Sequence, residues 1–240
     1  MISSRREIIT LAGLGLASAS LPTRLEASTT PPPGIDTLRQ ALLLNRNRIL
    51  SLHLVYTTDG DEAGPPRQLY FDGRNYHLRQ ETSGKTAFQI VTPRDTVTGL
   101  IGNPSSYHRR PTAKWPPATS LENFLPSITR LPSLPEGTTT EDAFECVRLS
   151  QGSYRLLVGL APTVVRSRTA IVAATGLARL TDTFADFRVI APDVLFPFRI
   201  DHHVFDRAGV VAAVRSTRVH SAEANQPLDP TLFDVAQYRR

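Results

Sequence analysis

Residues 224–233 read ANQPLDPTLF and lie a few positions before the last residue of the sequence. The stretch is a polar turn with two prolines and a Leu-Phe pair, and it follows a long region with strand-like alternation. Asn225 and the prolines are expected to end the last strand, because proline cannot donate a hydrogen bond to a sheet. We expect Leu228, Leu232 and Phe233 to fold back over the rim of that sheet.

The region before this turn alternates between apolar and polar residues with a period of two. Leu52, Leu54 and Tyr56 would share one face of a strand. Asp72-Gly73 is a strong hairpin turn between two further alternating runs. About ten or eleven short strands follow one another through short turns without crossover helices, which predicts an antiparallel meander. A sheet of that length must coil or close, because strands twist.

Two segments interrupt the strand pattern. Ile35 to about Leu50 has helical spacing, with Asp36 in the first turn and Arg46 and Arg48 in the last. Residues 111–141 are rich in proline and contain a second helical phrase that Pro126 should kink or split. The apolar positions of this phrase are Leu121, Phe124, Leu125, Ile128 and Leu131. It is either a movable lid on the sheet or a helix packed permanently as a plug.

The N-terminal region resembles an export signal. Residues 4–9 read SRREII, a twin arginine followed by an apolar stretch from Ile8 to Leu21 that is too short to span a bilayer. We interpret residues 1–28 as a twin-arginine signal peptide, with a general secretory signal or an anchored start as the alternatives. Residues 29–34 would be a proline-rich linker, and 35–240 a single domain.

Composition excludes several functional classes. The 240 residues carry a net charge of +5, but the arginines are scattered and no nucleic-acid-binding motif is present. Cys146 is the only cysteine, so no internal disulfide can form, and its pattern is typical of a buried thiol in a strand. We therefore expect no nucleic-acid partner.

Catalytic and metal-binding motifs are weak. Asp201-His202-His203 is the best cluster of ligand types, but adjacent strand residues point to opposite faces, so only Asp201 and His203 would share one. The sequence has no G-x-S-x-G elbow and no glycine-rich phosphate loop. We predict a protein that is not an enzyme and has no cofactor, metal or catalytic residue.

The last third of the chain resembles the periplasmic lipoprotein-carrier superfamily of LolA and LolB. The matching pieces stand in the family's order and are Phe187-Arg188-Val189-Ile190, then Leu195-Phe196-Pro197-Phe198-Arg199-Ile200, and finally the closing run from Asn225 to Phe233. The leading helix, the first alternating strand and the turn at Asn103-Pro104 also fit the family layout. The resemblance extends over about 60 residues at the C-terminal end and is looser before it.

This resemblance implies a mainly β (α+β) fold: an antiparallel half-open β-barrel of about eleven strands with a helical lid. Its apolar concave face would hold the acyl chain of a lipid or lipoprotein, and its inner surface would exceed what the two helices cover. The expected ligand-binding residues are Leu52, Leu54, Tyr56, Leu69, Phe71, Tyr76, Leu78, Phe88 and Ile90 on the sheet, with Phe124, Leu125 and Ile128 on the lid. Carrier members of the family hold the lid with an arginine, and Arg74 is the nearest counterpart.

The resulting hypothesis is a monomeric periplasmic or secreted carrier protein, with envelope membrane proteins as further candidate partners. A second hypothesis is an envelope sensor or protein-interaction module built on the same fold. A secreted hydrolase is a third, and it would require a polar constellation inside the hollow. The sequence identifies neither the ligand nor whether the protein transfers it.

Overall fold

A computed structural model describes residues 33–58, 65–113, 120–126, 134–141, 144–151 and 153–236. The predicted signal peptide 1–28, most of the linker, and the lid residues Ile128 and Leu131 lie outside these ranges. All the described residues belong to one compact unit, residues 32–240. No helix among them is long and apolar enough to cross a membrane.

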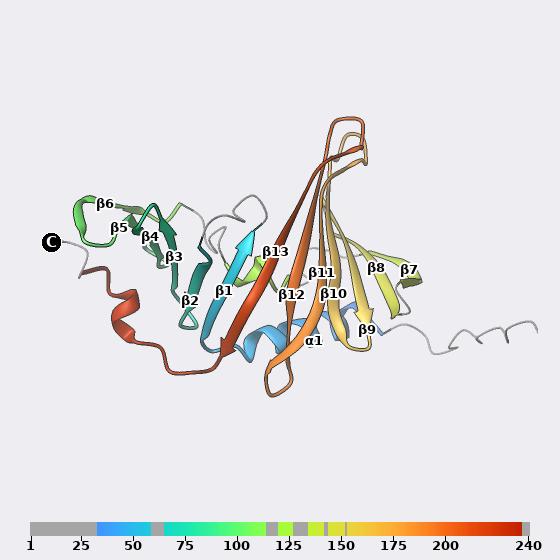
Figure 1. The fold of residues 1–240 in the computed structure, drawn as a ribbon. Helices are drawn as coiled ribbons and strands as arrows, with labels where there is room; N and C mark the ends of the chain where they lie inside the picture. The colour runs from blue at the N-terminus through green and yellow to red at the C-terminus, as the bar shows by residue number, and fades with distance from the viewer. Residues whose placement is uncertain are drawn as a thin grey trace, which may run out of the picture. The chain divides into compact units, whose positions relative to one another are not determined.

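Thirteen strands form one antiparallel sheet in the described part of the chain (Figure 1). They are β1 Leu52–Thr58, β2 Arg67–Phe71, β3 Tyr76–Thr82, β4 Lys85–Val91, β5 Asp95–Leu100, β6 Asn103–Pro111, β7 Leu134–Glu141, β8 Phe144–Gln151, β9 Tyr154–Leu160, β10 Thr163–Ile171, β11 Ala178–Ala191, β12 Val194–Phe205 and β13 Val211–Ala224. Their order is β6-β5-β4-β3-β2-β1-β13-β12-β11-β10-β9-β8-β7.

The predicted antiparallel meander is therefore confirmed, but the strand number of about eleven is not. Strands that follow one another in sequence pair, except β6 and β7, and β1 pairs with β13 to join the first and last strands. The sheet does not close, because β6 and β7 remain at its two edges. Because the sheet stays open, a helix and other segments can pack on its face.

Helix α1, Ile35–Asn47, forms as its apolar spacing predicts. Leu38 and Leu42 are buried on the face turned to the sheet, and α1 contacts β10 and β12. Asn45 fixes this position: its Nδ2 donates to the Leu195 carbonyl at 3.0 Å, and its Oδ1 accepts from the Leu195 amide at 2.9 Å. A pair of hydrogen bonds to the start of β12 therefore holds the helix across the sheet.

The C-terminal stretch 224–233 begins by anchoring the end of β13. β13 ends at Ala224, and Asn225 follows with φ of 62°, a conformation that asparagine tolerates better than most residues. The Asn225 side chain accepts a hydrogen bond from the Leu50 amide at 2.8 Å and donates one to the Arg48 carbonyl at 2.8 Å. The end of the last strand is thus tied to the turn between α1 and β1.

After this anchor, the chain packs on the outer face of β3–β5 rather than on the rim of the sheet. The 3₁₀ turn η2, Pro230–Phe233, begins at Asp229, whose carboxylate accepts from the Thr231 amide at 2.9 Å. Phe233 is buried and meets the His77 ring edge-on, with centroids 6.5 Å apart. We call residues 225–236 the C-terminal cover.

Candidate functional site

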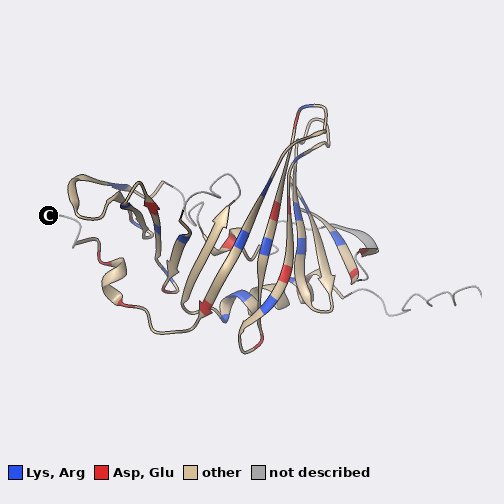
Figure 2. Cartoon of the chain, in the orientation of Figure 1, with Lys and Arg blue, Asp and Glu red and all other residues tan. Residues whose placement is uncertain are grey.

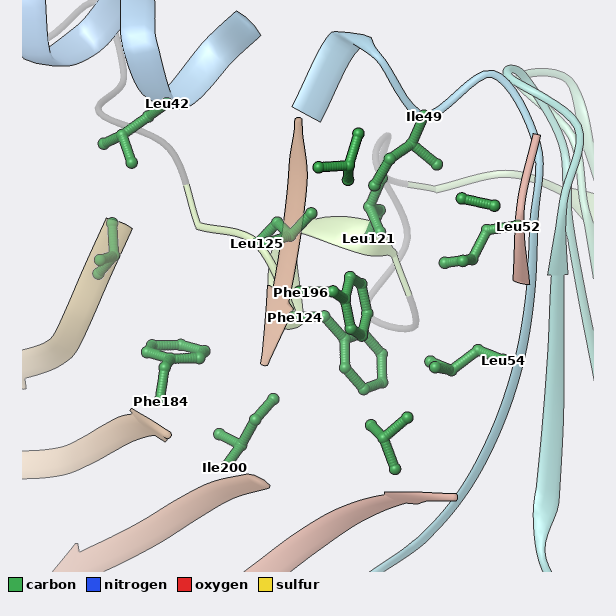
Figure 3. Packing of buried hydrophobic residues seen from close by; sticks show 14 of the residues in the cluster. Leu42, Ile49, Leu52, Leu54, Leu121, Phe124, Leu125, Phe184, Phe196 and Ile200 are labelled. Carbon is green, nitrogen blue, oxygen red and sulfur yellow. The ribbon is translucent and has the colours of Figure 1, made fainter. Parts of the chain in front are cut away.

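The sheet carries one large apolar cluster on the face that α1 covers. Strand pairing places Leu52 beside Phe71, and Leu54 beside Leu69. The same face continues through Phe184 and Ile200 of β11 and β12, which are paired, and through Phe196. Figure 3 shows Leu52, Leu54, Phe184, Phe196 and Ile200 converging with Leu42 and Ile49 from the helical side. We call this the inner cluster and its side of the sheet the inner face.

A short segment completes the burial of the inner cluster. Residues 120–126 form a single turn, with the 3₁₀ helix η1 at Leu121–Asn123. Leu121, Phe124 and Leu125 point into the cluster, and all three are less than 10% exposed (Figure 3). The Phe124 ring stacks on Phe196 at 5.7 Å between centroids and meets Tyr56 edge-on at 5.4 Å. We call residues 120–126 the inner cover.

Polar contacts hold the inner cover at its edge. Arg46 of α1 donates to the Glu122 carboxylate at 2.7 Å, and Arg168 of β10 donates to the Glu122 carbonyl at 3.5 Å. The phenol of Tyr76 interacts with the Leu121 backbone and with Arg46, while burial raises the pKa of Tyr76 above its ordinary value. Two arginines therefore contact this segment, and Arg46 is the one that pairs with the Glu122 carboxylate. Its pairing with Glu122 is partly exposed, so it is a modest contribution to stability.

A cavity of about 350 Å³ lies beside Phe124 on the inner face. Its wall is apolar at Phe124, Leu180 and Ile200 and polar elsewhere. The lining residues are Tyr56, Thr58, Arg67, Asn123, Phe124, Arg168, Leu180, Asp182, Ile200, His202 and Thr217. A guest with both an apolar and a polar part would meet complementary surfaces here.

The polar side of this cavity is a hydrogen-bonded row across four strands. The Asp182 carboxylate is buried; it accepts from Arg168 at 2.7 Å and from His202 Nδ1 at 2.7 Å. Since His202 Nδ1 donates there, the Nε2 of a neutral ring accepts from Thr217 at 3.1 Å. Burial would raise the pKa of Asp182, but the hydrogen bonds from His202 and Arg168 outweigh it and hold that pKa below its usual value.

Sequence reasoning did not find this row. It treated Asp201 and His203 as the pair of interest, whereas the inward residue of that stretch is His202. Asp201 instead accepts from Ser216 at 2.8 Å and pairs with Arg199. The partners Arg168 and Asp182 come from β10 and β11, so only the strand register could have brought them together. Among the described residues, no group of three or more His, Cys, Asp and Glu side chains could hold a metal ion.

The structure brings most of the predicted binding residues together. Leu52, Leu54, Tyr56, Leu69, Phe71, Tyr76, Phe124 and Leu125 belong to the inner cluster, and Leu78 packs against it. Whether they bind a ligand stays a prediction. Ile128 lies outside the described residues. Arg74 lies exposed in the β2–β3 turn, where its amide donates to Asp72 at 2.9 Å, and its role as a latch also stays a prediction.

The expectation that Phe88 and Ile90 share this face is wrong. In the β3–β4 pairing, Phe88 lies opposite Arg79, and Ile90 lies opposite His77, whereas Tyr76 faces Val91. Because paired residues share a face, Phe88 and Ile90 point away from the inner cluster. With Val97, they form a separate outer cluster, against which Tyr107 and Val235 pack.

The expected uncovered hollow does not extend over Leu52 and Leu54; the described inner face is hollowed beside Phe124 instead. Leu52 and Leu54 expose 0% of their surface, because α1 and the inner cover fill the space above them. A larger groove of about 610 Å³ lies instead at the C-terminal cover, lined mainly by polar residues such as Asp72, Asn75 and Asn225. Its lining includes no residue of the inner cluster. A tail that reaches the fully buried Leu52 and Leu54 has to displace the side chains that cover them.

These features define a class of fold: an open, twisted antiparallel sheet whose inner apolar face is covered by a helix and a short segment. No family model and no curated protein matches the sequence. Solved structures do match. A LolA superfamily protein from Nitrosomonas europaea superposes with a TM-score of 0.54 at 12% identity, covering 86% of this chain and 100% of that one.

Two further structures agree. A putative outer membrane lipoprotein-sorting protein domain from Vibrio parahaemolyticus gives a TM-score of 0.51 at 9% identity, covering 86% of this chain and 100% of that one. A DUF1329 family protein from Desulfovibrio piger gives 0.50 at 10% identity, covering 85% and 98%. The chain therefore has the LolA-like fold that its C-terminal motifs predict. At these identities the likeness shows the fold alone.

Proposed function

We propose that this protein binds the acyl chain of a lipid or lipoprotein on its inner face, without covalent chemistry. Three observations support the proposal: the LolA-like fold, the size of the inner cluster, and a cavity with apolar and polar walls beside Phe124. The inner cover gives the strongest support to the proposal, because a single turn of chain packs three apolar side chains against the sheet. A periplasmic or extracellular location is part of the proposal and suits the twin arginine at Arg5-Arg6.

The energetics define the kind of guest that can enter. Exposing Leu121, Phe124 and Leu125 would cost about 1.5–3 kcal/mol each, or roughly 6 kcal/mol together. A tail gains about 0.8 kcal/mol for each CH₂ group that it buries, so about eight groups only balance that cost. A 14-carbon tail gains on the order of 10 kcal/mol before the cost of association. We therefore expect chains of about 14 carbons to bind and eight-carbon chains not to bind.

Displacement of the fluorescent fatty acid cis-parinaric acid tests this directly. Myristate should compete for the site and octanoate should not. Phe124→Ala should strengthen binding, because it removes part of the cover that the tail replaces. Phe88→Ala is the matched control: it also removes a buried phenylalanine, but from the outer cluster, and should leave binding unchanged.

Native mass spectrometry of protein purified from its own host gives an independent test. Co-purified acyl lipid would support the proposal. Failure of the protein to take up any long-chain acid, together with equal behaviour of Phe124→Ala and Phe88→Ala, would overturn it.

A further inference from the structure

The described chain exposes its large apolar side chains unevenly. Half of those identified as exposed gather where the hairpins β10–β11 and β12–β13 end. They are Val172, Leu177, Val204, Val210, Val211 and Val214, and they are between 38% and 62% exposed. We call these two hairpin ends, residues 171–178 and 204–214, the tip.

The tip extends past the neighbouring strands. β9 pairs with β10 only up to the Ala170–Tyr154 pair, and the described part of β1 pairs with β13 only as far as Thr58 and Thr217. Residues 211–216 of β13 continue beyond Thr217 without β1 beside them, and both hairpin turns lie beyond the end of β9, as Figure 1 shows for the upper ends of these strands. The tip therefore presents two faces instead of one.

Both faces are apolar at β13. Residues 210–214 read VVAAV, and all five are exposed. Successive strand residues point to opposite faces, so Ala213 and Val214 cannot both belong to one packed side. Strands that cover a core on one side normally alternate apolar and polar residues. This run has no such alternation, so burial within the chain does not account for it.

The charges near the tip are mainly positive. Arg179 is exposed next to the tip, and Arg207 is exposed in the turn that connects β12 and β13. Figure 2 shows mostly uncharged positions along the strands below this turn. Asp206 precedes Arg207 in the same turn, and its carboxylate accepts from the amides of Ala208 and Val210 at 2.8 and 2.9 Å. Apolar side chains bordered by arginine suit an anionic lipid surface, where the long stems lie among the chains and the guanidinium groups meet the headgroups.

We propose that the tip inserts into the interfacial layer of an anionic lipid bilayer. A fluid bilayer surrounds a projection and can cover both faces, whereas a folded partner protein would cover one. The insertion is shallow, because the edge of β13 beyond Thr217, where no described strand pairs with it, carries backbone groups that need water at this depth. This docking surface is separate from the inner face, so either proposal can fail without the other.

A dye placed within the tip tests the proposal in the full chain. Ala212→Cys, labelled with an environment-sensitive fluorophore, reports on the tip, and Val189→Cys is the control because Val189 is exposed on β11 outside it. The native Cys146 is buried at 1% exposure and should not react in the folded protein. Vesicles of phosphatidylcholine with 30% phosphatidylglycerol should shift the emission at residue 212 to the blue and leave residue 189 unchanged.

Substitutions identify the groups responsible. In the Ala212→Cys protein, Val210→Thr with Val214→Thr should weaken vesicle partitioning about tenfold, because hydroxyls replace buried methyls while strand propensity is kept. Leu50→Thr with Ile101→Thr removes comparable exposed apolar groups elsewhere and should change nothing. Arg179→Gln with Arg207→Gln should weaken binding to anionic vesicles and reduce its salt dependence.

Two results would overturn the proposal. One is an unchanged emission at residue 212 with vesicles present. The other is a blue shift that appears without lipid and grows with protein concentration, which would assign the tip to contact between two copies of the chain.

Discussion

The two apolar clusters lie on opposite faces of one sheet and are covered in different ways. The outer cluster, around Phe88 and Ile90, lies under the C-terminal cover, which Asn225 ties to the backbone of the α1–β1 turn. The inner cover depends on its own apolar side chains and on an ion pair between Arg46 and Glu122. The Asn225 side chain makes two short hydrogen bonds to the backbone of that turn, whereas a single partly exposed ion pair contributes little. The inner face is therefore the one that can open.

Removing a large buried side chain from a strand of the inner cluster should lower the free energy of unfolding the most. Phe196 of β12 is fully buried and stacks under Phe124. Phe196→Ala should lower the free energy of unfolding by about 3–5 kcal/mol, because the sheet cannot collapse into the space. Phe124→Ala should cost less, since the inner cover can readjust. Urea unfolding of both variants measures the difference, and equal losses would mean that the inner cover is as rigid as the strands.

The stability of the protein should depend on pH through a histidine on the outer face. His77 is fully buried, and desolvation, with the charge of Arg79 nearby, lowers its pKa to about 4. The unfolded chain therefore takes up a proton first as the pH falls from about 6.5, so stability is lost between pH 6.5 and 4. The shift corresponds to roughly 3 kcal/mol.

Unfolding followed by circular dichroism across this range measures the effect. His77→Gln should flatten the profile between pH 6.5 and 4. A profile that keeps its slope in this variant would assign the effect to other groups. The pKa of Asp182 is lowered in the folded protein, so the stability that Asp182 contributes is lost mainly at more acidic pH. The effect of His77 can therefore be measured separately.

Loss of Asn225, which anchors the C-terminal cover, should have an intermediate effect on the free energy of unfolding. Asn225→Ala removes the side-chain hydrogen bonds with Leu50, Ser51 and Arg48, and it places an alanine at a φ of 62°, which alanine adopts poorly. We expect a loss of about 2 kcal/mol in the free energy of unfolding. Asn225→Gly separates the two causes, because it keeps the backbone freedom but not the hydrogen bonds. Equal stability of the native protein and both variants would show that the cover is held by other contacts.

The anchor of the inner cover should have the smallest effect on stability. Arg46→Gln should cost about 0.2–1 kcal/mol, as expected for a partly exposed ion pair. Its effect should appear in kinetics instead, as faster uptake of cis-parinaric acid in stopped-flow fluorescence. Arg48→Gln is the control, since Arg48 pairs with Asp193 at 3.6 Å away from the inner cover. Equal uptake rates in both variants would remove Arg46 from the opening step.

The sequence predicted the strands better than it predicted which face each one presents. The alternation of Leu52, Leu54 and Tyr56 was sufficient for β1, because one cluster takes every second residue. Phe88 and Ile90 also alternate, but their face depends on the β3–β4 register. The turn at Ser83-Gly84 sets Thr82 opposite Lys85, and counting from it places Val91 beside Tyr76. A slip of one residue reverses the faces of a whole strand.

The row of polar residues beside the cavity could not be predicted from the sequence, for a different reason. Arg168, Asp182 and His202 are separated by 14 and 20 positions around Asp182, and no local motif connects them. They meet only because β10, β11 and β12 pair in one particular register. The tip was equally hidden, since a run such as VVAAV reads as a buried strand until the lengths of its neighbours are known.

Clamping the inner cover shut tests the central claim most directly. Arg46→Cys with Glu122→Cys places two reactive thiols where the ion pair stands, and a short bismaleimide can bridge them while the buried Cys146 stays unmodified. Binding of cis-parinaric acid should weaken at least about tenfold in the bridged protein, a loss of about 1.4 kcal/mol or more. The same double variant without the bridge should bind normally. Equal binding by the bridged and open forms would contradict the account, because the acyl chain would then enter without moving residues 120–126.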